Sequence, residues 1–90
     1  MAIVKKIPEE YQLAKAKVEA LTPQDRLVYD YLMSGRKLTG LAAFTTLGVA
    51  SLTSRIATLR RLGMTINDEW AHDHFERRYK AYWVPSGEDA

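Results

Sequence analysis

Hydroxyl and guanidinium groups are concentrated in one stretch of the sequence, from Ser51 to Ile66 (S-L-T-S-R-I-A-T-L-R-R-L-G-M-T-I). Hydroxyls crowd its first turn, two adjacent arginines lie near its end, and a glycine follows them. Hydroxyl groups donate hydrogen bonds to phosphates and to base edges, and an arginine can pair through two bonds with guanine. The composition therefore favours a nucleic-acid contact, although each residue taken alone fits a helix cap or a solvated helix face equally well.

The spacing of apolar residues predicts which of these side chains face outward. Within residues 51–62 the apolar residues recur at helical intervals, and Gly63 is the expected stop. The inner face consists of Leu52, Ile56 and Leu59. Side chains on the opposite face, and those of the first turn, are free to meet DNA. The predicted DNA contacts of this helix are Ser51, which is also its expected cap, Thr53, Ser54, Arg55, Thr58 and Arg61.

A second group of basic residues lies outside this helix. No Asp or Glu occurs between Asp30 and Asp68, so the basic side chains of that interval create a local positive field that would attract a polyanion. The net charge of the chain, +2, indicates nothing by itself, and a gap in acidic residues also arises by chance in a short chain. The additional predicted DNA contacts are Arg36, Lys37, Arg78 and Lys80.

The sequence offers little support for catalysis or metal binding. It contains no cysteine. His72 and His74 form a close pair, but two histidines without further ligands are a weak metal site and fit a solvated loop better. No base is placed to activate Ser51 or Ser54 as a nucleophile. We therefore expect a protein that is not an enzyme and that needs neither a cofactor nor a metal.

The N-terminal residues predict an amphipathic helix over residues 8–20. Pro8 and the two glutamates after it suit the first turn of a helix. The apolar residues form a single stripe: Ile7, Tyr11, Ala14, Val18 and Leu21. Such a stripe covers either the domain core or the same helix of a second subunit. We interpret residues 1–21 as a candidate dimer element, with packing on the core as the alternative.

Two further helices precede the one at Ser51. Thr22 and Pro23 mark the start of the first, and Asp25 can reach back to complete a capping box. The second follows its cap Thr39 and ends at a glycine, and the very short link to the next helix is typical of a helix-turn-helix. The further predicted core residues are Leu27, Val28, Tyr31, Leu32, Leu41, Ala43, Phe44, Leu47, Ile66 and Trp83.

After Gly63 the periodicity changes from helical to alternating. The runs M-T-I-N-D-E-W and R-R-Y-K-A-Y-W-V predict a β-hairpin with a loop at residues 71–76. The predicted fold is therefore mainly α with a C-terminal β-hairpin: a winged helix-turn-helix with a three-helix core, a wing and an extra N-terminal helix. We expect this domain over residues 22–85, followed by a frayed tail at residues 86–90.

The segment from Leu38 to Val84 resembles the small helix-turn-helix domains of bacteriophage and prophage genomes. The resemblance rests on L-T-G-L-A-A-F-T-T-L-G-V, L-T-S-R-I-A-T-L-R-R-L-G-M-T-I and R-R-Y-K-A-Y-W-V. It implies that Ser54, Arg55 and Arg61 occupy DNA-facing positions. The hairpin departs from the pattern, because Phe75 and the glutamate after it stand where similar domains often carry Gly-Lys or Gly-Arg.

These features predict a double-stranded DNA-binding protein, a phage-type regulator of transcription or recombination, with helix 51–62 in the major groove. A homodimer on a two-fold site would give so small a protein enough phosphate contacts. The alternative is a winged-helix module that binds or inhibits a host protein. Because no apolar run is long enough to cross a membrane, the expected location is the cytoplasm, associated with the nucleoid or in a phage-infected bacterial cell.

Overall fold

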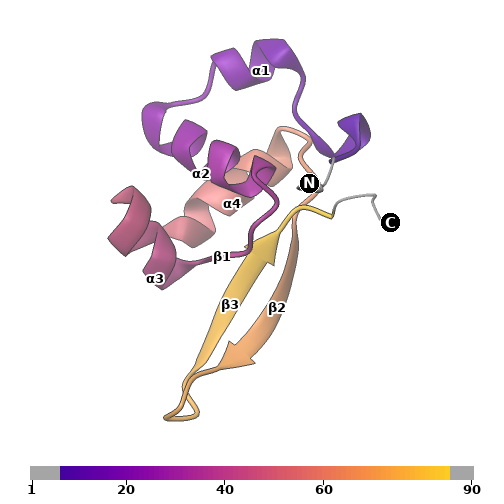
Figure 1. Cartoon of the computed structure of the whole chain (residues 1–90). Coiled ribbons are helices and arrows are strands. Elements are labelled where there is room, and N and C mark those ends of the chain that lie inside the picture. The colour runs from indigo at the N-terminus through magenta and orange to yellow at the C-terminus, as the bar shows by residue number, and fades with distance from the viewer. Residues whose placement is uncertain (1–6, 86–90) are drawn as a thin grey trace, which may run out of the picture.

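The computed structural model describes residues 7–85. Helices precede a three-stranded antiparallel sheet with the order β1-β3-β2, and the β2–β3 hairpin projects away from the helices (Figure 1). In chain order the elements are η1 (Glu9–Tyr11), α1 (Lys15–Glu19), α2 (Pro23–Met33), β1 (Leu38–Thr39), α3 (Gly40–Ala42), η2 (Ala43–Leu47), α4 (Leu52–Arg61), β2 (Asn67–His72) and β3 (Arg78–Trp83). The predicted class, mainly α with a C-terminal hairpin, is confirmed. The predicted tail at residues 86–90 lies outside the described residues, as do residues 1–6.

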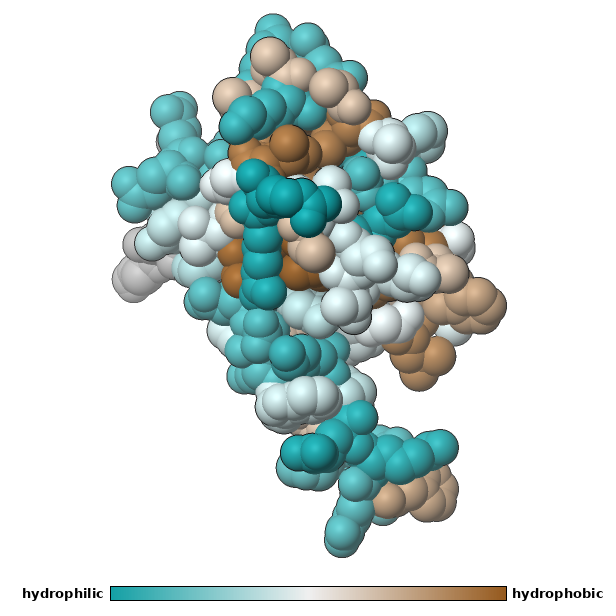
Figure 2. All heavy atoms as spheres, turned by 180° about the vertical axis from the view of Figure 1, so that it is seen from behind, coloured by the Kyte–Doolittle hydropathy of each residue, from teal (hydrophilic) through white to brown (hydrophobic). Residues whose placement is uncertain are grey.

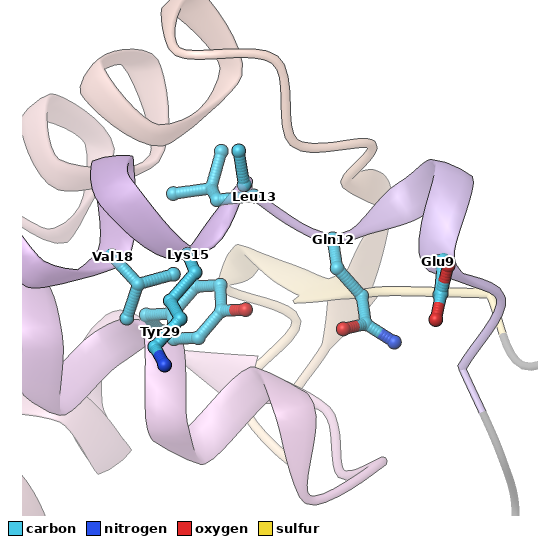
Figure 3. Close-up of a pocket in the computed structure, with 7 residues that line it drawn as sticks. Glu9, Gln12, Leu13, Lys15, Val18 and Tyr29 are labelled. Carbon is cyan, nitrogen blue, oxygen red and sulfur yellow. The ribbon is translucent and has the colours of Figure 1, made fainter.

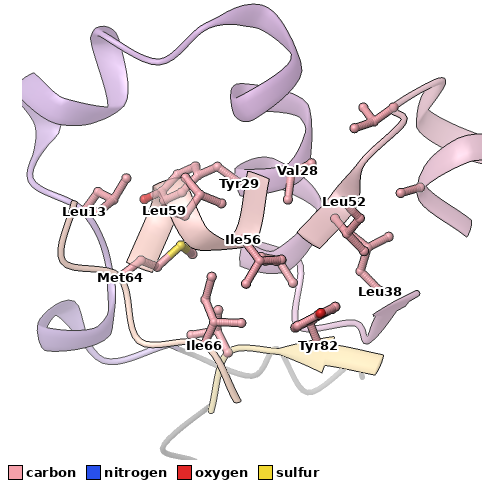
Figure 4. Packing of buried hydrophobic residues seen from close by; sticks show 14 of the residues in the cluster. Leu13, Val28, Tyr29, Leu38, Leu52, Ile56, Leu59, Met64, Ile66 and Tyr82 are labelled. Carbon is pink, nitrogen blue, oxygen red and sulfur yellow. The ribbon is translucent and has the colours of Figure 1, made fainter. Parts of the chain in front are cut away.

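Helices α2 and α4 pack their apolar faces together above the root of the sheet (Figure 4). The side chains of Val28, Leu32, Ile56 and Leu59 form the centre of this contact, and each exposes 1% or less of its surface. Burial of a side chain of this size contributes about 1.5–3 kcal/mol. The other members of the core are Ile7, Leu13, Tyr29, Leu38, Ala43, Val49, Leu52, Met64, Ile66, Tyr82 and Val84.

Several predicted core positions are wrong. On α2 the buried stripe consists of Asp25, Val28, Tyr29 and Leu32, which lie at i, i+3, i+4 and i+7. The stripe is therefore rotated away from the predicted one, and its first member is an acid that forms an ion pair with an arginine of α4. The predicted core residues that are exposed are Leu27, Leu41 and Phe44. Tyr31 and Leu47 are half-buried and pack against the core, as predicted, while Trp83 is half-buried outside it.

The predicted single helix over residues 8–20 is also wrong. A turn of 3-10 helix, η1, is separated from the short helix α1 by extended backbone at Gln12 and Ala14. This break lets Leu13 enter the core, whereas Ala14 of the predicted stripe is exposed. Hydrogen bonds tie the segment to the domain: the backbone N–H of Thr65 donates to Tyr11 at 3.2 Å. The apolar side chains that suggested a subunit seam therefore complete the core of one chain, and a homodimer remains a prediction.

Two predicted helix caps are confirmed. Thr22 Oγ1 accepts a hydrogen bond from the backbone N–H of Asp25 at 3.3 Å, and Thr39 Oγ1 accepts one from a backbone N–H of α3 at 3.1 Å. Gly48 ends η2 in the left-handed region, with φ at 69°, as expected for a C-terminal glycine. The Asp25 side chain does not complete the predicted capping box, because its carboxylate is paired with a side chain of α4.

The sheet contains a strand that was not predicted, and the hairpin begins later than predicted. β1 pairs with β3 through Leu38 and Tyr82, so the chain just before α3 is joined to the hairpin. A strand of two residues is too short to show any periodicity in the sequence. β2 starts only at Asn67, because Met64 and Ile66 first turn into the core. The loop accordingly occupies residues 73–77 rather than 71–76.

Candidate nucleic-acid interface

The outward face of α4 consists of small, hydroxyl and basic side chains and carries no acid. Thr53, Ser54 and Arg61 are exposed on the side opposite the buried leucine and isoleucine residues. Thr58 is half-buried; its Oγ1 donates to the Ser54 carbonyl at 3.1 Å and accepts from Arg61 Nη2 at 3.4 Å. The hydroxyls of Thr53 and Ser54 are therefore more accessible to a ligand than that of Thr58.

Ser51 precedes α4 but does not cap it with its side chain, contrary to the prediction. Its backbone is in the left-handed region, at φ 57° and ψ 51°, which is uncommon for a residue other than glycine. The Ser51 carbonyl accepts hydrogen bonds from the backbone N–H groups of Ser54 at 3.0 Å and Arg55 at 3.3 Å. The exposed Ser51 hydroxyl thus remains at the start of α4 without a role inside the helix.

Arg55 is directed toward α2 rather than outward. Its Nη1 lies 3.2 Å from Asp25 Oδ1, and 6% of the Asp25 side chain is exposed, against 31% of that of Arg55. Moving the guanidinium onto a base would leave the Asp25 carboxylate buried and unpaired, which is costly. The predicted guanine contact stays a prediction. Nothing local in the sequence indicated the ion pair, because the two residues are 30 positions apart.

Most of the cations between Asp30 and Asp68, and Lys80 on the hairpin, are paired with carboxylates. Lys37 Nζ lies 2.7 Å from Glu69 Oε2, and Arg60 Nη2 lies 2.8 Å from Asp68 Oδ2. Lys80 Nζ lies 3.8 Å from Asp68 Oδ1. The side-chain hydrogen bond from Arg60, together with the charge of Lys80, lowers the pKa of Asp68 below its ordinary value, so this carboxylate stays ionised. Ion pairs within the chain therefore offset the charges of Asp68 and Glu69, which would otherwise repel a phosphate.

Among the predicted DNA contacts, three cations are not paired with a carboxylate within residues 7–85: Arg36, Arg61 and Arg78. Arg36 lies over an aromatic ring of α2, at 4.5 Å from its centre. The register of the hairpin sets Trp70 opposite Lys80, and the cations of both Lys80 and Arg78 lie 5.1 Å from the centre of the Trp70 ring. The wing cations Arg78 and Lys80 thus share one face of the hairpin.

Other kinds of site have less support. An open hollow of ≈ 580 Å³ between the N-terminal segment and α2 is lined in part by Gln12, Lys15 and Tyr29, and no nucleophile and base meet there (Figure 3). Within residues 7–85 no three His, Cys, Asp or Glu side chains gather closely enough to hold a metal ion. His72 and His74 are both exposed. In the same range no helix has both the length and the apolar character needed to cross a membrane.

Comparison with known proteins agrees with this geometry. A family model described as a winged helix-turn-helix domain matches residues 23–85, from the start of α2 to just after β3. No curated protein and no solved structure matches the chain. In such a domain α3 and η2 form the first helix of the helix-turn-helix, α4 is the second, and β2 and β3 form the wing. A domain of this kind suggests DNA as the partner.

Proposed function

Because the chain belongs to the winged helix-turn-helix family, we propose that it binds double-stranded DNA with the N-terminal half of α4 in the major groove. One observation carries the proposal: α4 is anchored by a fully buried apolar face, and its opposite face presents hydroxyl groups and an arginine but no acid. A groove lined by phosphates accepts hydrogen bonds from such a face and would repel carboxylates there.

The accessible side chains divide the predicted contacts into two groups. Ser51, Thr53 and Ser54 are exposed at the start of α4 and are the proposed contacts with bases and nearby phosphates. Arg61 is exposed near the end of the helix and is a proposed phosphate contact. Arg55 acts through its ion pair as a positioning residue that fixes α4 against α2. The proposed supporting phosphate contacts are Arg36, Lys37, Arg78 and Lys80, while the Thr58 hydroxyl is satisfied within the helix.

We further propose that the protein is a regulator of transcription or recombination of the phage type rather than an enzyme. A single copy offers few cations free of a carboxylate partner within the described residues, which limits the affinity of one chain for DNA. A homodimer on a two-fold symmetric site would double that number. Selection of bound sequences from random duplexes tests this directly, because a homodimer should enrich a two-fold symmetric motif and a monomer should not.

The experiment for DNA binding uses a matched pair of variants and a mixed-sequence duplex. Ser54→Asp places a carboxylate on the proposed contact face, at the first turn of α4, where an acid also suits the helix dipole, so the fold should persist. Ala16→Asp makes the same charge change at an exposed position of α1. Wild type and Ala16→Asp should bind at about 50 mM salt and lose affinity steeply by about 200 mM, whereas Ser54→Asp should bind at least tenfold more weakly. Absence of wild-type binding at the lower salt concentration would refute the proposal.

A second candidate function, binding of a host protein, is favoured by two exposed apolar side chains. Leu41 and Phe44 are 73% and 64% exposed on α3 and η2. Exposed apolar groups on neighbouring turns are common in protein interfaces. If this function is the main one, Leu41→Ser and Phe44→Ser should abolish partner binding and leave the thermal stability unchanged. Strong salt-dependent binding of the wild type to mixed-sequence DNA would count against it.

A further inference from the structure

The tip of the β2–β3 hairpin carries the most exposed large apolar side chain of the described residues, Phe75, at 76%. The hairpin projects from the body of the domain as a narrow arm (Figure 1). In the space-filling view the far end of this arm is mostly hydrophilic, with one small apolar group (Figure 2). Phe75 does not contribute to the hydrophobic core, which lies at the other end of the hairpin.

Hydrogen bonds fix the backbone of the turn that carries this ring. Asp73 Oδ1 accepts hydrogen bonds from the backbone N–H groups of Phe75 at 2.8 Å and Arg77 at 2.9 Å, and Asp73 Oδ2 accepts one from Arg77 Nε at 3.0 Å. These bonds, with that from the Arg77 backbone largest, lower the pKa of Asp73, so the carboxylate stays charged and the turn stays closed. Glu76 takes up the left-handed conformation that closing the turn requires, at φ 62°.

One cation, that of Arg77, lies against the ring at the tip. The Arg77 guanidinium lies 5.1 Å from the centre of the Phe75 ring, and Arg78 and Lys80 follow on β3. The negative charge of Asp73 is offset by its ion pair with Arg77. Glu76 is the remaining carboxylate of the tip, and its charge opposes contact with a polyanion. Arg78 offsets the charge of Glu76, because Lys80 is paired with Asp68, so the tip is close to neutral and its charges do not prevent a duplex from approaching the ring.

The arm also has the length needed to reach a second groove of DNA. Each of its strands contains six residues. At roughly 3.3 Å per residue such a strand extends about 20 Å. Half a turn of the double helix, which separates a major groove from the next minor groove on one face, measures about 17 Å. With α4 in the major groove, the tip can therefore reach the adjacent minor groove.

We propose that the hairpin tip inserts the Phe75 ring between two base pairs in the minor groove and kinks the duplex there. This inference rests on the proposed DNA-binding function. An apolar wedge between base steps unstacks them and bends DNA away from the wedge, and the nearby cations bind the phosphates that the bend brings closer. Pyrimidine–purine steps are the preferred point of insertion, because they unstack at the lowest cost.

The test measures bending and binding separately with the full chain. The probe is a duplex of about 30 base pairs, selected by the wild-type protein from a random pool and labelled at both ends for energy transfer. The variants are Phe75→Ala, Phe75→Leu and, as a matched control, Phe44→Ala, which removes another exposed phenylalanine, from η2. A 2-aminopurine base at the central step reports unstacking in a parallel experiment. Thermal melts establish that the variants keep the fold.

Wild type and Phe44→Ala should raise the energy transfer and the 2-aminopurine fluorescence. Phe75→Ala should bind about tenfold more weakly and leave the duplex straight, and Phe75→Leu should restore part of the bend because leucine also serves as a wedge. Equal affinity and equal bending for wild type and Phe75→Ala would overturn the wedge, while DNA binding would stand. A wild type that binds no duplex in the salt titration refutes the proposed function first.

Discussion

Helix α4 and the β2–β3 hairpin are the two parts of the domain proposed to meet DNA, and they are held in opposite ways. α4 buries three side chains of its inner face, Leu52, Ile56 and Leu59, in the core. Every residue of β2 is exposed or half-exposed, and β3 is buried only at Ala81 and Tyr82, near its root. The hairpin is held instead by the antiparallel pairing of β2 with β3, by ion pairs and by cations over Trp70.

This difference suggests a division of work between the two elements. A helix fixed by the core presents its outward groups in one geometry, as recognition of a base pattern requires. An arm fixed by surface charge pairs has few buried contacts and can adjust its position at little cost. The arm is thus suited to follow or deform a duplex whose position α4 has already determined.

The largest expected effect is on stability, when one large side chain is truncated to alanine in α4 and one in the hairpin. Leu59→Ala removes a fully buried side chain of α4 and should lower the free energy of unfolding by about 2–5 kcal/mol. Trp70→Ala removes a larger side chain from β2, but that side chain is more than half exposed, so the loss should stay below about 1 kcal/mol. Chemical denaturation of the two variants measures both values. Equal losses would mean that the hairpin is as much a part of the core as α4.

A smaller loss of stability is expected when the ion pair that positions α4 is broken. Asp25→Ala leaves the Arg55 guanidinium without its partner and should lower the free energy of unfolding by roughly 2 kcal/mol, less than for a fully buried pair because Arg55 keeps some contact with water. Glu69→Ala breaks the exposed pair with Lys37 and should cost about 0–1 kcal/mol. Thermal melts at neutral pH compare the two. Losses of similar size would show that the Asp25 pair is no more than a surface contact.

Sequence periodicity predicted the part of the fold that depends on local pattern. The inner face of α4 and the caps Thr22 and Thr39 are as predicted, because each needs only residues within about two helical turns. The burial of Ala43 and the left-handed glycine after η2 are also as predicted. The exposed hydroxyls of the candidate site follow from the same helical period.

Features that depend on distant residues were not predictable in this way. The N-terminal stripe is regular enough for one helix, yet a break at Gln12–Ala14 buries Leu13, because the shape of the core beneath decides which residues reach it. Arg55 is on the first turns of α4, but its direction is set by an acid on α2. The strand β1 exists only because β3 lies beside it. Such pairings become visible only when the chain is folded.

A third prediction extends the comparison to the charges that face DNA. Arg61 has no carboxylate partner within the described residues, whereas Lys80 on β3 shares Asp68 with Arg60. If DNA binding is established, Arg61→Ala should reduce the slope of log affinity against log salt by about 0.9, and Lys80→Ala should reduce it by less. Arg26→Ala, which breaks an exposed pair on α2, is the charge-matched control and should leave the slope unchanged. A larger change for Lys80 than for Arg61 would make the arm the main phosphate contact.

The smallest expected effect is a loss of order at acid pH, which should occur in the hairpin before it occurs in α4. The pKa of Asp68 is lowered, first by the hydrogen bond from Arg60, and the pKa of Asp73 is lowered, first by the backbone N–H of Arg77. A carboxyl whose pKa is lower in the folded state stabilises that state above its ordinary pKa, here 3.8, and loses this contribution as pH falls through the lowered value.

Below pH 3.8 the arm should therefore lose order while the core of α4 persists. The backbone amide signals of the hairpin, followed by NMR during acid titration, should shift before those of α4. Asp68→Asn should remove part of the hairpin transition, because its amide cannot be protonated in this range. Glu76→Gln, which changes a tip carboxylate that forms no ion pair within the described residues, is the control and should leave the transition in place. A transition common to both elements, and equal in Asp68→Asn and wild type, would show that the ion pairs do not hold the arm.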